Sequence, residues 1–143
     1  MTDAVKAARR VQIQRELPPL RNRRSDNVRD RNRLVEQIES LRDTNNKLQN
    51  CLSSMSDVRR KVRDCHQTVA PRDFRGVRRR EIESKLNDAS ECVRAQRDRH
   101  VENRERILRQ IKTLRERRDT LNGTINTQNN RITALEAELR GLW

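Results

Sequence analysis

The side chains best suited to nucleophilic or metal chemistry are two histidines and three cysteines. His66 follows Cys65 directly, and adjacent residues on a helix point in different directions, so this pair does not converge on one reactant. His100 lies on a different predicted helix. Cys51, Cys65 and Cys92 fit neither a disulfide framework nor a C-x-x-C zinc site. We therefore expect no catalytic, metal or cofactor site, and we interpret the cysteines as buried free thiols.

The acidic residues also lack a catalytic arrangement. Glu81 and Glu83 are two residues apart, as are Glu136 and Glu138, and side chains at that spacing do not meet on a helix. Most acidic residues instead have Arg or Lys three or four positions away. This pattern is typical of a solvated surface held by ion pairs.

The chain is strongly basic, because 34 Lys and Arg against 21 Asp and Glu give a net charge of +13. Such a charge suits nucleic acid, an anionic membrane or an acidic protein. Arg-rich runs occur at 21–24, 59–61 and 78–80. However, the chain has no Tyr, one Phe and one Trp, so stacking on bases is not available to it. Nucleic-acid binding through non-specific phosphate contacts is kept as an alternative.

Apolar residues recur in steps of three and four, the pattern of helices that bury one narrow stripe. The pattern predicts one helix over about residues 26–69 and another over about residues 77–140. Asn45 lies on the first stripe and is the kind of polar residue that specifies register and partner number. In the second helix the heptad phase shifts between Gln96 and Arg104, which predicts a weak, polar segment.

The segment 70–76, which contains Pro71, Phe74 and Gly76, separates the two patterns and predicts a tip. We expect an all-α fold, a long antiparallel two-helix coiled-coil hairpin over residues 25–143. Facing residues should have numbers that sum to about 150. Residues 1–24 should form a short basic helical arm. We expect a break in it at Leu17-Pro18-Pro19-Leu20, because proline lacks an amide donor and disfavours helix before it.

The heptads from Leu121 to Leu142 extend past the start of the first predicted helix and need to be covered. The arm could cover them, since Ile13 would lie near Ala137. We favour a partner chain, because the arm is short and broken by prolines. This partner is either a helical protein or a second copy that completes an antiparallel four-helix assembly. The predicted partner-binding residues are Phe74, Gly76, Leu121, Ile125, Ile132, Leu135 and Leu139.

Three parts of the sequence together resemble a known family: Leu48-Gln49-Asn50-Cys51-Leu52, Phe74-Arg75-Gly76, and the I-x-x-L repeats from Ile107 through Leu139. This pattern resembles the WXG-type (Esx-like) helical hairpins of type VII secretion, especially their YwqH-like members. The resemblance implies a partner, chaperone or targeting factor for an exported protein. A weaker resemblance, in length, charge and hairpin form, is to FliJ-like coiled coils that engage an export ATPase.

We therefore predict a protein that is not an enzyme and that acts by protein–protein contact, with a structural subunit of a larger assembly as the alternative. Phe74→Ala should impair partner binding more than it reduces helicity. The N-terminus lacks an apolar leader, and no apolar run is long enough to span a bilayer. The expected location is cytoplasmic, and export by a signal-independent route is left open.

Overall fold

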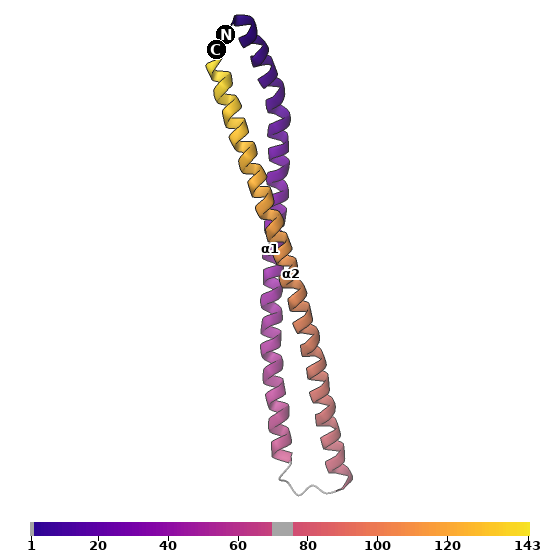
Figure 1. Cartoon of the computed structure of the whole chain (residues 1–143). Helices are drawn as coiled ribbons and strands as arrows, with labels where there is room; N and C mark the ends of the chain where they lie inside the picture. The colour runs from indigo at the N-terminus through magenta and orange to yellow at the C-terminus, as the bar shows by residue number, and fades with distance from the viewer. Residues whose placement is uncertain (1, 70–75) are drawn as a thin grey trace. The chain divides into compact units, whose positions relative to one another are not determined.

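The computed structural model describes residues 2–69 and 76–143. Helix α1 spans Asp3–Val69 and helix α2 spans Val77–Gly141 (Figure 1). The two helices pack against each other as a hairpin, and the described residues contain no strand. This confirms the predicted all-α hairpin.

The predicted helix break in the N-terminal arm is wrong. Helix α1 is 67 residues long and passes through Pro18 and Pro19, whose rings are exposed. An interior proline costs a helix about 3 kcal/mol. Here the chain around the prolines packs tightly, because Leu17 is buried and Leu20 packs against the same apolar cluster. Packing on α2 therefore offsets the local cost, and α1 begins at Asp3 instead of near residue 26.

Contacts divide the chain into two compact units, and each is described by itself. The terminal unit comprises Met1–Glu39 and Lys112–Trp143. The bend unit comprises Ser40–Ile111. Each unit contains a segment of α1 and a segment of α2.

The terminal unit has the best-packed core of the described chain. Ile13 and Leu135 are fully buried, with 0% of each exposed. They form a cluster with the buried Leu17 and Ile132. Burying one Leu or Ile side chain contributes roughly 1.5–3 kcal/mol. The remaining apolar contacts of the cluster come from Leu20, Leu139 and Leu142.

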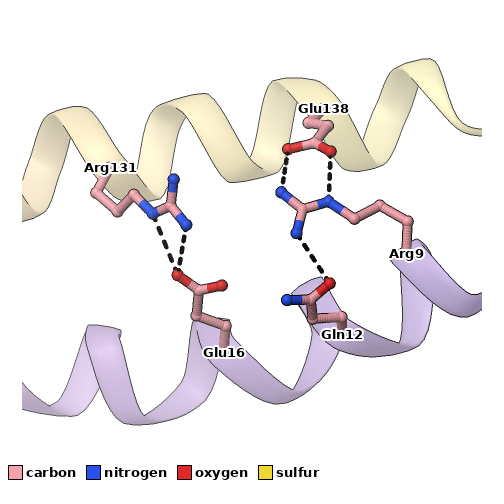
Figure 2. A network of polar contacts seen from close by, with 5 residues as sticks. All are labelled: Arg9, Gln12, Glu16, Arg131 and Glu138. Atoms are coloured by element: carbon pink, nitrogen blue, oxygen red, sulfur yellow. Dashed lines mark hydrogen bonds and ion pairs between the residues drawn. The ribbon is translucent and has the colours of Figure 1, made fainter.

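Charged side chains also join α1 to α2 in the terminal unit, and Figure 2 shows two of these pairs. Arg9 donates two hydrogen bonds to Glu138, from Nε at 2.6 Å and from Nη2 at 2.9 Å. Arg131 donates to one carboxylate oxygen of Glu16, with its Nη2 2.8 Å away. A third pair joins Arg21 to Glu136 at 2.6 Å. All three pairs link an N-terminal to a C-terminal segment, so they hold the antiparallel register.

The Arg9–Glu138 pair changes the proton affinity of both groups. The hydrogen bond from Arg9 lowers the pKa of the Glu138 carboxyl, and the positive charges of Arg9 and Arg131 act in the same direction. The hydrogen bond to Glu138 raises the pKa of Arg9. Both side chains are partly exposed, so solvent and salt screen this pair.

Amide side chains extend the same register along the terminal unit. Asn27 donates to Gln128 at 3.2 Å, and Arg31 donates to Asn122 at 3.4 Å. These pairs lie close to the facing positions expected for a bend near residue 75.

The last residue of the chain also contacts α1. Trp143 is 82% exposed, and the Cζ atom of Arg10 lies 4.8 Å from the centroid of its ring. This is the geometry of a cation–π contact. Because Trp143 is the only tryptophan, its fluorescence reports on the terminal unit.

Candidate protein-binding surface

The five C-terminal residues that we expected to bind a partner lie in the terminal unit, against the chain's own N-terminal segment. Three are buried and two are half-buried: Ile125, Ile132 and Leu135, then Leu121 and Leu139. Cover for this seam comes from the same chain, because α1 continues through its prolines and brings Ile13 and Leu17 onto α2. Binding of a further partner at these residues stays a prediction.

The predicted recognition tip is described only at its last residue. Gly76 is exposed and has a φ of +79°, a left-handed conformation that glycine adopts without the strain a side chain would bring. Its carbonyl accepts a hydrogen bond from the Arg80 amide at 3.4 Å, so it stands at the start of α2. Phe74, with the rest of 70–75, lies outside the described residues.

The bend unit has an apolar seam that is much less covered than that of the terminal unit. The only buried side chain among its described residues is Ile111, at the unit's edge. The other seam residues are half-buried, and we call them the bend seam: Leu41, Leu48, Leu52, Met55 and Val62 on α1, and Ile82, Leu86, Ala89, Val93 and Ile107 on α2. Their spacing continues the heptads, so the difference from the terminal unit lies in what covers them.

Polar residues interrupt the bend seam where the sequence predicts a phase shift. His100 and Arg104 are half-buried at this part of α2, and Asn45 is half-buried on α1. The Oδ1 atom of Asn45, Nδ1 of His100 and Nε of Arg104 are buried and have no hydrogen-bond partner among the described residues. Burying an unpaired polar atom costs about 1–3 kcal/mol. This polar layer therefore weakens the seam beyond its lack of apolar cover.

A basic hollow lies beside the bend seam, between side chains of both helices. It has a volume of about 530 Å³ and is lined by Arg59 of α1 and by residues of α2 that include Arg94 and Arg97. A neighbouring hollow of about 310 Å³ shares Arg59 and Arg97 and adds Arg63. We call these four residues, Arg59, Arg63, Arg94 and Arg97, the arginine hollow.

The four guanidinium groups of the arginine hollow form no ion pair with another described residue. The adjacent Arg60, by contrast, pairs with Asp57. Two carboxylates, Glu91 and Asp98, also line the larger hollow. The arrangement presents several hydrogen-bond donors from two helices toward one space, which suits a carboxylate or phosphate ligand.

Sequence reasoning found only one residue of this hollow, Arg59. It identified the basic run at 59–61 but gave no role to Arg94 or Arg97. The signal that could have found them is the hairpin register, which brings this part of α2 opposite Arg59.

The expectation of buried thiols is wrong for Cys51, Cys65 and Cys92, all of which are exposed and free. The half-buried seam passes through neighbouring residues such as Leu52 and His66, so the thiols fall on the outer side of it. Among residues 2–69 and 76–143, no group of three or more His, Cys, Asp or Glu side chains is placed to hold a metal ion. Neither described helix has a stretch apolar enough to cross a bilayer.

Comparison with known proteins adds no relative to this description. No protein-family model, no curated protein and no solved structure matches this chain.

Proposed function

We propose that this protein acts by binding a helical protein partner along the bend seam, without catalysis. The observation that carries the proposal is the contrast in burial between the two units. In the terminal unit, heptad residues such as Leu135 are fully buried by the other helix of the same chain. In the bend unit, heptad residues such as Leu86 stay half-buried.

A third helix is the natural cover for such a seam. Heptad side chains of two antiparallel helices leave grooves that accept side chains of a further helix at three- and four-residue spacing. Helix-in-groove recognition uses the same spacing of apolar anchors. The bend seam supplies these anchors from both α1 and α2.

A narrower proposal concerns what the binding serves. The resemblance to WXG-type hairpins supports a role as partner, chaperone or targeting factor for an exported protein, in which Phe74 and Gly76 would add to recognition at the tip. An export-ATPase partner and a structural subunit of a larger assembly use the same mode of binding, so the bend seam is the feature common to all of these proposals.

Photo-crosslinking in cells that make this chain tests the proposal. A photoreactive residue in place of Leu86 should capture a specific protein, and the same residue in place of the buried Leu135 should not. The captured protein is identified by mass spectrometry, purified and titrated against the full chain.

Matched variants then localise the binding. Leu86→Gln should weaken the measured affinity by roughly tenfold, because it removes about 1.4 kcal/mol of apolar contact. Leu108→Gln is the control, since Leu108 is already 44% exposed on the same helix. Equal effects of the two substitutions, or no captured protein at Leu86, would contradict the proposal.

A further inference from the structure

We infer that the partner is an acidic amphipathic helix whose apolar stripe lies on the bend seam and whose carboxylates enter the arginine hollow. This inference rests on the proposed function and specifies the chemistry of the partner. It requires that the apolar seam and the basic hollow be one continuous surface, and that no ion pair within the described chain already neutralise the hollow.

The seam and the hollow share residues. Val93 belongs to the bend seam and also lines the larger hollow. Arg59 stands at a heptad position of α1 and lines both hollows. A helix lying on the seam therefore brings its flanking side chains within reach of guanidinium groups from both α1 and α2.

The four guanidinium groups of the arginine hollow form no ion pair with a described residue, whereas comparable arginines of the terminal unit do. Arg9, Arg21 and Arg131 each bind a glutamate of the opposite helix. Arg59 and Arg97 make no such contact with any described residue, although they too come from opposite helices. A partner that supplies Glu or Asp side chains would repeat in the bend unit the cross-helix pairing of the terminal unit, with favourable Arg–carboxylate geometry.

A second copy of this chain fits the surface less well. In a twofold dimer the same patch lies on both sides of the interface, so the interface would contain the arginine hollows of both copies. Like charges placed together across an interface oppose binding. The net charge of +13 adds to this repulsion.

Nucleic acid also fits less well. A phosphate backbone would use the arginines but would leave the apolar bend seam uncovered, and the chain has no Tyr and only one Phe and one Trp for base stacking. An acidic helix uses both parts of the surface.

Fluorescence anisotropy with two synthetic helices tests the inference on the full-length protein. The first probe has Leu at heptad positions a and d and Glu at positions e and g, and the second has Gln in place of every Glu. We expect the Glu probe to bind at least about tenfold more tightly at low salt, and the difference to shrink as salt screens the charges.

Charge variants locate the effect. The double variant Arg59→Gln and Arg97→Gln should weaken binding of the Glu probe by roughly fivefold and leave the Gln probe unchanged, since each exposed ion pair contributes only modestly. The control is Arg23→Gln with Arg115→Gln, two exposed arginines of the terminal unit whose loss changes net charge equally. Circular dichroism verifies that both variants keep their helicity.

The outcomes separate this inference from the proposed function. Equal binding of the two probes, with both weakened by Leu86→Gln, would overturn the acidic partner and support the seam. A crosslinked partner segment of neutral or basic sequence would also overturn the acidic partner and support the seam.

Two other outcomes would assign the surface to a different ligand. If a thymidine oligonucleotide binds more tightly than the Glu probe, and the Arg59 and Arg97 variant loses this binding, the hollow is assigned to nucleic acid instead. Self-association in sedimentation equilibrium that Leu86→Gln abolishes would assign the seam to a second copy.

Discussion

Contact between the N-terminal arm and the C-terminal heptads can be tested with a double-mutant cycle on Ile13 and Leu135. Both side chains are fully buried, and they belong to the same cluster from opposite helices. We propose the substitutions Ile13→Ala and Leu135→Ala, singly and together. If the arm covers α2 within one chain, the two sites must be energetically coupled.

The size of the effect follows from the burial. Truncating a buried Leu or Ile to Ala costs about 2–5 kcal/mol, depending on how well the site collapses. This cluster lies between only two helices, and the half-buried Leu139 and Leu142 at its side can shift inward, so we expect about 3 kcal/mol for each single variant. The second truncation removes contacts that the first has already lost. The double variant should therefore cost about 1 kcal/mol less than the sum.

Urea unfolding monitored by Trp143 fluorescence is the assay, because the ring contacts Arg10 in the same unit. The titration is repeated at two protein concentrations. A midpoint that does not depend on concentration shows that the cover comes from the same chain, whereas a second copy would make the midpoint rise with concentration.

Additivity to within about 0.5 kcal/mol would refute the contact between Ile13 and Leu135. A control cycle combines Leu135→Ala with Leu52→Ala, whose side chain lies in the bend unit. This second pair should be additive. Where the Ala variants are too unstable to measure, Ile13→Val and Leu135→Val give a smaller cycle of the same sign.

Two further predictions concern the terminal unit. The lowered pKa of Glu138 means that the carboxylate stabilises the fold above its ordinary pKa of about 4.3 and loses this contribution as the pH falls through the lowered value. The melting temperature of the wild type should therefore exceed that of Glu138→Gln near neutral pH, and the gap should close in acid and in high salt; a gap independent of pH would contradict the assignment. Pro19→Ala should stabilise the chain by up to about 3 kcal/mol, because it restores an amide donor inside α1, while the control Asn22→Ala should gain less than about 0.7 kcal/mol. Equal effects of Pro19→Ala and Asn22→Ala on thermal melts would show that Pro19 does not lie in a helix interior.

The heptad pattern was sufficient to predict the hairpin. Apolar steps of three and four define one face of each helix, and the cluster of Pro71, Phe74 and Gly76 marked the only place where both patterns stop together. The structure describes α1 as far as Val69 and α2 from Val77, on either side of this cluster.

The continuous helix through Pro18 and Pro19 could not be predicted from the local sequence. Pro18 and Pro19 carry a strong local preference against helix, and nothing near them in sequence shows that Leu17 has a partner more than a hundred residues later. The helix persists because Leu17 packs with Ile132 and Leu135. Tertiary packing of this kind routinely overrides propensity.

The arginine hollow depends on register in a similar way. Arg59 and Arg97 lie on different helices, and they share a hollow only once the antiparallel alignment is known. Sequence spacing along one helix identifies ion pairs at three or four residues, such as Arg60 with Asp57. Spacing along one helix does not show which arginines of two different helices lie together, or which of them form no ion pair.

The cross-helix pairs of the terminal unit also have a consequence for the order of events during synthesis. Arg9 and Glu138 are 129 positions apart, and Arg131 and Glu16 are 115 apart. Ile13 and Leu17 leave the ribosome more than a hundred residues before Ile132 and Leu135, which bury them. Closing so long a loop is slow for a helical protein. The nascent chain therefore exposes Ile13 and Leu17 until Leu135 has emerged, and aggregation or capture by a chaperone competes with folding during that interval.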